Sequence, residues 1–181
     1  MNRQLEKKAY LDVHTGLANK SCCEKFLNDD QFISEATAVI VYDLNNLKTV
    51  NDTLGHVVGD QFILNFSRLL RDSVPTHDFV GRYGGDEFII IYEGLQEQEV
   101  VERAMRLRKK IMELGIAHAY SKALPIVTIS QGICQSIPQE GNKSWDFLHI
   151  ADEYLYKAKK QERNSICAGT LRGQYQTISL Q

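Results

Sequence analysis

Residues 82–88 read Arg-Tyr-Gly-Gly-Asp-Glu-Phe, so two glycines are followed at once by two acids. Apolar residues lie on both sides, at 79–80 and 88–91. Two apolar runs joined by paired glycines predict a tight β-hairpin over about 78–92, because glycine readily adopts the positive φ angles of primed turns. Adjacent acids at a hairpin tip have two interpretations: a solvated turn, or a site for a cation or a reacting group.

The hydrophobic pattern around this hairpin predicts alternating strands and helices. A β-branched run at 36–42 is typical of a buried central strand, and helical spacing follows it. The further elements that we expect are helices over 20–29, 44–54, from about Gly59 to Pro75, over 97–114 and from Ser144, and strands at 126–133 and 166–167. This order predicts an α/β chain with a central mixed sheet flanked by helices.

Composition narrows the classes of function. The 181 residues carry a net charge of −2, with no basic field suited to nucleic acid. The four cysteines lack metal-ligand spacing and indicate reduced thiols in the cytoplasm. No apolar run approaches the roughly 18 residues of a membrane span, so we expect no membrane contact. We expect one compact domain at 11–169, preceded by a helical linker (1–10) and followed by a tail (170–181).

Asp43 ends the predicted central strand, where a buried carboxylate needs a compensating partner. It either caps the following helix or binds a cation. If the strand pairs with the hairpin, Asp43 and Asp86 converge at one sheet edge, and such hard oxygen ligands suit Mg²⁺ or Mn²⁺. A metal pair is a known device for phosphoryl transfer. Glu87 is the less secure ligand, because successive strand residues point to opposite faces.

A polar series on the next two helices is the second candidate site. Asn51 and Asp60 offer an amide and a carboxylate, which match the acceptor and donor edges of guanine. Lys48 lies one turn before Asn51 and is placed to reach phosphate. The plain alternative is a solvated surface that also includes Asp52 and His56.

Two basic residues near the end of the last helix form a third candidate. Lys159 and Arg163 are four residues apart and share a helix face. Together they suit a polyphosphate. Pairing with Glu162 or with solvent is the alternative.

These motifs together resemble the GGDEF family, the diguanylate cyclases. The hairpin segment 84–88 is similar to the motif that names the family, and further similar segments follow in the family's order. These are Asp-Val-His-Thr-Gly-Leu-Ala-Asn-Lys at 12–20, Asp-Leu-Asn-Asn-Leu-Lys-Thr-Val-Asn-Asp at 43–52, Gly-His at 55–56, Gly-Asp at 59–60, and 151–164. The resemblance covers about residues 10–168.

The resemblance implies a fold like the palm of nucleotidyl cyclases and polymerases. It also implies a nucleotidyltransferase that condenses two GTP into cyclic di-GMP with release of pyrophosphate, working as a homodimer. The implied roles are metal binding by Asp43, the Leu44 carbonyl, Asp86 and Glu87; deprotonation of the attacking hydroxyl by Asp86 or Glu87; guanine and ribose binding by Asn51, His56 and Asp60; and phosphate binding by Lys48, Lys159 and Arg163. A fused or separate sensor domain would supply the signal.

Several positions depart from the family pattern. Asn45 and Leu47 replace a usual Asp and Phe, His14 replaces a Leu, and Glu162 replaces a Gly. We expect Asn45 to remove a charge beside the metal site. At the positions of the family's inhibitory Arg-x-x-Asp motif, residues 75–78 of this chain are Pro-Thr-His-Asp, so only Asp78 remains. We therefore expect no product inhibition at this place.

Two alternatives to the cyclase stay open. The first is a catalytically weak GTP-binding module that regulates a partner, which Asn45 and Glu162 favour. The second is a related cyclase that uses another base. Asp60 favours guanine over adenine in that comparison.

Overall fold

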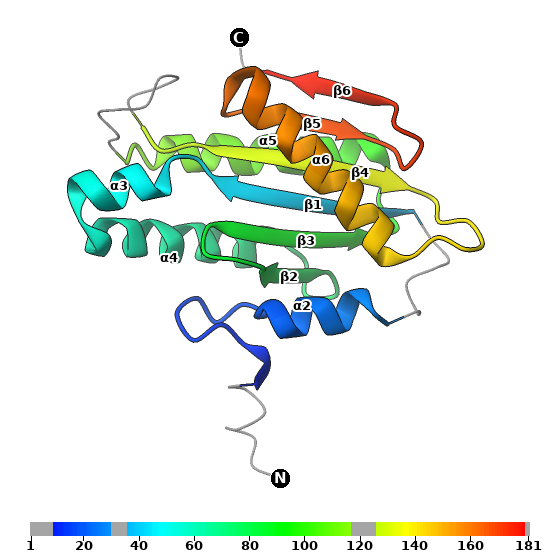
Figure 1. The fold of residues 1–181 in the computed structure, drawn as a ribbon, viewed down its shortest axis with the longest axis horizontal. Helices are drawn as coiled ribbons and strands as arrows, with labels where there is room; N and C mark the ends of the chain where they lie inside the picture. Colours follow the sequence, from blue (N-terminus) through cyan, green and yellow to red (C-terminus); the bar gives the residue numbers. More distant parts are fainter. Residues whose placement is uncertain (1–8, 30–35, 117–125, 180–181) are drawn as a thin grey trace.

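A six-stranded mixed sheet forms the centre of the molecule. The computed structural model describes residues 9–29, 36–116 and 126–179. The elements are α2 (Lys20–Leu27), β1 (Thr37–Leu44), α3 (Leu47–Leu54), α4 (His56–Ser73), β2 (Phe79–Arg82), β3 (Glu87–Glu93), α5 (Glu97–Glu113), β4 (Ile129–Ser136), α6 (Ser144–Glu162), β5 (Ile166–Gly169) and β6 (Tyr175–Ile178). The strand order is β2-β3-β1-β4-β5-β6, and only β4 and β5 run parallel. The predicted mixed sheet with flanking helices is confirmed (Figure 1).

The central strand β1 is buried along its whole length, as its β-branched sequence predicts. Its side chains alternate between two hydrophobic clusters, because successive strand residues point to opposite faces. Ala38, Ile40 and Tyr42 pack into the cluster with α4 and α5. Val39 and Val41 pack into the cluster with α2 and α6. Helices therefore cover both faces of β1. Its carboxyl end, at Asp43 and Leu44, lies where the strand leaves the sheet.

Several boundaries differ from the sequence expectations, and α3 begins at Leu47 instead of at 44, because Leu44 still belongs to β1. Helix α4 begins at His56 instead of near Gly59, because Gly55 (φ 87°) ends α3 and leads directly into α4. Strand β4 spans Ile129–Ser136, a few residues later than predicted. Lys143, not Ser144, holds the N-cap position of α6, where its N–H donates to Asp146 at 2.7 Å. The expected tail contains β6, which pairs with β5.

The expected linker, 1–10, falls largely outside the described residues. Its last two residues, Ala9 and Tyr10, are helical. None of the described helices is both long and apolar enough to cross a membrane.

Gly132 on β4 lets α6 lie directly against the sheet. A Cβ at this position would overlap the carbonyl oxygen of Ala151 and the backbone nitrogen of Leu155. Backbone atoms of a packed helix cannot move aside cheaply. The distance between α6 and the sheet therefore depends on this glycine, and α6 carries Lys159, which is predicted to bind phosphate, with Arg163 directly after it.

We predict that Gly132→Ala lowers the free energy of unfolding by about 3 kcal/mol, because the added methyl group forces α6 away from β4. Gly85→Ala is the matched control, since its Cβ would meet no atom within 4 Å. Urea denaturation of both variants measures the difference. A Gly132→Ala protein as stable as the wild type would contradict this packing.

Candidate functional site

The predicted acids meet where β1 and β3 lie side by side. Asp43 stands opposite Glu87 in the antiparallel ladder, and the Leu44 N–H donates to the Asp86 carbonyl at 3.1 Å. The predicted pairing of the central strand with the hairpin is thus confirmed. It brings three carboxylates from two distant segments to one edge of the sheet.

Asp43 is only 8% exposed, and its partner is a lysine, not the start of a helix. Lys159 Nζ lies 2.6 Å from Asp43 Oδ2. The N-cap position of α3 belongs to Asn46, so Asp43 does not cap that helix. Burial raises the pKa of the Asp43 carboxyl, Lys159 opposes this rise, and the charges of Asp86 and Glu87 add to it. The site therefore holds an excess of negative charge around one buried carboxylate.

The hairpin tip forms in a different way from the one predicted. Neither Gly84 nor Gly85 has a positive φ, so the expected primed turn is wrong. The connection between β2 and β3 is a longer loop, in which the N–H groups of Tyr83 and Gly84 both donate to the Glu87 carbonyl, at 2.9 and 3.1 Å. Asp86 lies in this loop and precedes the regular strand, so strand alternation does not hold it away from Glu87.

Glycine at position 84 makes room for an acid. A Cβ there would lie 3.0 Å from Oε2 of Glu87. The Glu87 side chain therefore folds back beside the loop. A larger residue at position 84 would crowd this carboxylate, and the backbone of Gly84 is not left-handed.

Asn45 takes a place that the sequence did not indicate. Its side chain is 3% exposed and lies 3.0 Å from Thr128 Oγ1 and 2.9 Å from Ser130 Oγ. With its oxygen turned toward the main chain, the amide also accepts from the Asn164 N–H at 3.2 Å. Whether the loss of a charge at position 45 affects the acidic site stays a prediction, and the contacts give Asn45 a structural role as well. Asn45 ties the end of β1 to β4 and to the segment after α6.

The second predicted phosphate ligand, Arg163, lies just after α6. Its guanidinium donates to Oδ1 of Asn46, which has a left-handed backbone (φ 62°) that asparagine tolerates. Lys159 thus contacts the end of β1, and Arg163 contacts the segment that follows it. The side chain of Glu162, the departure from the family pattern in this clamp, lies outside the described part of the structure.

The residues predicted to bind guanine lie on α3 and on the first turns of α4. Asn51 rests on Gly59, where an added Cβ would overlap the Asn51 amide, and its buried Oδ1 has no hydrogen-bond partner. Asp60 and His56 are exposed on α4. Lys48 is exposed on α3, as is Asp52. The groups that a ligand can reach at this surface are therefore the exposed side chains of Lys48, His56 and Asp60, whereas the Asn51 oxygen is buried.

The remnant of the inhibitory motif has a structural contact. Oδ1 of Asp78 accepts a hydrogen bond from the Glu93 N–H at 3.3 Å, which links the start of the hairpin to its end.

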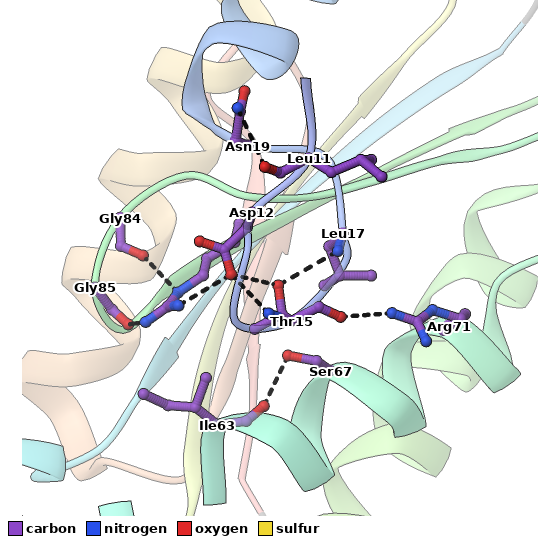
Figure 2. A network of polar contacts seen from close by, with 11 residues as sticks. Leu11, Asp12, Thr15, Leu17, Asn19, Ile63, Ser67, Arg71, Gly84 and Gly85 are labelled. Atoms are coloured by element: carbon purple, nitrogen blue, oxygen red, sulfur yellow. Dashed lines mark hydrogen bonds and ion pairs between the residues drawn. The ribbon is translucent and has the colours of Figure 1, made fainter. Parts of the chain in front are cut away.

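A hydrogen-bond network around Arg82, which the sequence analysis missed, joins the hairpin tip to the turn that contains Asp12 (Figure 2). Arg82 donates from Nε to the Gly84 carbonyl at 3.2 Å and from Nη2 to the Gly85 carbonyl at 2.8 Å. Its Nη1 lies 3.1 Å from Oδ1 of Asp12. The guanidinium therefore joins the loop that precedes the acids to the opening motif of the chain. An arginine before the glycines and the Asp12 turn are the signals that could have indicated this pair.

The Asp12 turn is itself well ordered by hydrogen bonds. Oδ1 of Asp12 accepts from the Thr15 N–H at 2.8 Å and from Thr15 Oγ1 at 2.7 Å. Burial alone would raise the pKa of the Asp12 carboxyl, but the bonds from Thr15 and Arg82 outweigh it and lower the pKa. Nη2 of Arg71, on α4, donates to the Thr15 carbonyl at 2.6 Å (Figure 2). One turn thus links the hairpin tip with the helix that carries Asp60.

We predict that Asp12→Ala loosens the hairpin tip and lowers the free energy of unfolding by about 2 kcal/mol, because Arg82 and Thr15 lose a shared charged acceptor. Hydrogen exchange should become faster at the amides of 83–87 and stay unchanged in β4. Asp72→Ala, at an exposed position on α4, is the control. Equal protection of 83–87 in both variants would contradict the role given to Asp12.

Comparison with known proteins agrees with this geometry. Residues 9–165 match the family described as diguanylate cyclase, GGDEF domain. A probable diguanylate cyclase, DgcC, of Escherichia coli K12 is 33% identical over 170 residues, which are 90% of this chain and 44% of DgcC. The chain therefore spans less than half the length of that relative.

Solved structures share the fold. The coiled coil and GGDEF domain of DgcB from Caulobacter crescentus, in complex with c-di-GMP, has a TM-score of 0.78 at 23% identity, over 92% of this chain and 88% of that one. An active GGEEF domain of a diguanylate cyclase from Vibrio cholerae has a TM-score of 0.64 at 26% identity, over 77% and 85%. Because the family match extends over most of the sequence and includes the acidic hairpin and both basic residues, the chain belongs to the GGDEF diguanylate cyclase family.

Proposed function

We propose that this domain condenses two molecules of GTP into cyclic di-GMP with release of pyrophosphate. The observation that carries the proposal is the β1–β3 pairing, which sets Asp43 opposite Glu87 and beside Asp86 with Lys159 in contact. Acids and bases held together at the end of a buried strand suit phosphoryl transfer, which depends mainly on positioning and charge neutralisation. The diguanylate cyclases among the relatives support the same reaction.

The acidic cluster fits a divalent ion that arrives with phosphates. In the described ranges, no group of three His, Cys, Asp or Glu side chains could hold a metal by itself. Magnesium in nucleotide sites uses one or two carboxylates together with substrate phosphates and waters, so a complete protein cage is not required. The Lys159 ammonium against Asp43 is a stand-in cation and shows that this carboxylate accepts positive charge.

Asp43, the Leu44 carbonyl, Asp86 and Glu87 would hold Mg²⁺ or Mn²⁺. When bound, the metal would neutralise charge on the phosphates and polarise the bond that breaks.

The nucleotide would lie between the acids and the two helices. Asn51 would donate from its amide nitrogen to the acceptor edge of guanine, and Asp60 would accept from the N–H edge, with His56 beside them. Lys48, Lys159 and Arg163 would neutralise the phosphates. Gly59 supports this assignment, because any side chain there would push Asn51 out of place.

Catalysis would need two copies of the chain. One subunit would hold one GTP, so the attacking 3′-hydroxyl and the α-phosphorus would come from different subunits. Asp86 or Glu87 would accept the proton of that hydroxyl, and in-line approach would depend on how the two domains face each other. We therefore propose a homodimer that works in the cytoplasm, where GTP is available, under the control of a fused or separate sensor domain.

The direct test is incubation of the dimeric protein with GTP and Mg²⁺, with detection of cyclic di-GMP. We predict product from the wild type and a loss of at least about a thousandfold from Asp86→Ala, because the reaction loses a ligand and a proton acceptor. Asp72→Ala is the matched control and should keep its activity. We also expect no inhibition by product, because Pro75 replaces the arginine of the inhibitory motif.

The other candidate functions appear as distinct outcomes. A dimer that binds GTP and forms no product would contradict the cyclase and favour the regulatory module. A cyclic product from another nucleotide would contradict the guanine assignment. Activity retained in Asp86→Ala would contradict the metal assignment.

A further inference from the structure

A lysine holds the buried acid at the centre of the site. Lys159 reaches from α6 to the end of β1, and its Nζ lies 2.6 Å from Oδ2 of Asp43. The Asp43 side chain is 11% exposed and the Lys159 side chain 34% exposed. The contact is therefore largely shielded from water, where an ion pair is stronger than one on the surface.

This ion pair compensates a site with too much negative charge. Burial is the largest cause of the raised pKa of Asp43, and Lys159 opposes it. Asp86 and Glu87 lie near enough to raise this pKa further. Among the described ion pairs, Lys159 is the partner of Asp43. Of the other predicted phosphate ligands, Arg163 contacts Asn46 and Lys48 is exposed on α3.

An ammonium group and a divalent ion compete for the same carboxylate. Both need the oxygen atoms of Asp43, and two cations on one carboxylate repel each other strongly where water is scarce. A metal ion that arrives alone must therefore displace Lys159 or bind against its charge. A metal ion that arrives with a nucleotide also brings phosphates, which give the displaced ammonium a new anionic partner.

We propose that Lys159 is an internal counter-ion that weakens the binding of a free divalent ion and favours entry of the metal together with the nucleotide. The proposal rests on the proposed nucleotide site for its second half only. Its first half, competition between Lys159 and the metal for Asp43, concerns the nucleotide-free protein and holds for any reaction of this site.

The test is titration of the nucleotide-free protein with Mn²⁺, followed by the electron paramagnetic resonance signal of free Mn²⁺. All variants are titrated at the same pH, pH 8. Lys159→Gln should bind Mn²⁺ about tenfold more tightly than the wild type, because a neighbouring positive charge is removed. Lys159→Arg keeps the charge and should bind like the wild type.

Lys160→Gln is the matched control for a general change of charge on α6. Lys160 lies over the ring of Tyr156, at 4.6 Å from its centroid, and should have no effect on Mn²⁺ binding. Lys159→Ala is a second neutral variant, and thermal melting verifies that each protein is folded. Unchanged or weaker Mn²⁺ binding in both neutral variants would overturn the proposal, as would equal gains in Lys159→Gln and Lys160→Gln.

A second titration separates this proposal from the proposed function. With a non-hydrolysable GTP analogue and Mg²⁺, the neutral Lys159 variants should bind the analogue at least fivefold more weakly than the wild type. If free Mn²⁺ binds more tightly in these variants but the wild type binds no analogue, the counter-ion role stands and the nucleotide site is wrong. If the analogue binds equally well to all variants, the proposal that the Lys159 ammonium moves from Asp43 to a phosphate of the nucleotide is overturned.

Discussion

Burial of the Asp43 carboxylate at the end of an otherwise apolar strand is the constraint on which the site depends. The six strand positions before Asp43 are all buried, and the side chains of 38–42 fill two hydrophobic clusters, one on each face of β1. An acid in that place is costly unless a cation compensates it. Lys159 supplies that cation, and the paired strand β3 brings Asp86 and Glu87 to the same edge. The requirement for positive charge is thus built into the fold.

The hairpin that carries the other acids is held by elements far away in the sequence. Arg82 joins its loop to Asp12, and Arg71 joins the same turn to α4. The acidic hairpin and α4, which carries Asp60, are therefore both held by the turn at 12–15. This turn lies shortly after the described helical residues Ala9 and Tyr10. A displacement of the chain at this turn would reach both halves of the site. This arrangement gives a physical route between the start of the domain and its acids.

The sequence predicted the features that follow from local pattern. The apolar run before Asp43 predicted the central strand, and the apolar runs around Gly84 predicted the hairpin and hence the meeting of the acids. It failed where tertiary contacts decide. The glycine pair suggested a primed turn, but neither glycine has a positive φ, and the Glu87 side chain approaches Gly84 closely. The contacts of the buried Asn45 amide with Thr128 and Ser130 were missed, because these partners are more than eighty residues away. Arg82 was missed because its partner, Asp12, is seventy residues away. The roles given to Lys48, His56 and Asp60 rest on the family resemblance and on their place at the surface of α3 and α4.

The most direct measurement is a crystal structure of the domain with a non-hydrolysable GTP analogue and Mn²⁺, with the anomalous signal of manganese recorded. The account predicts a manganese peak in contact with Asp43 and Asp86, guanine against Asn51, and Lys159 moved from Asp43 to a phosphate oxygen. A manganese peak away from Asp43, or Lys159 still paired with Asp43 beside the bound nucleotide, would contradict it.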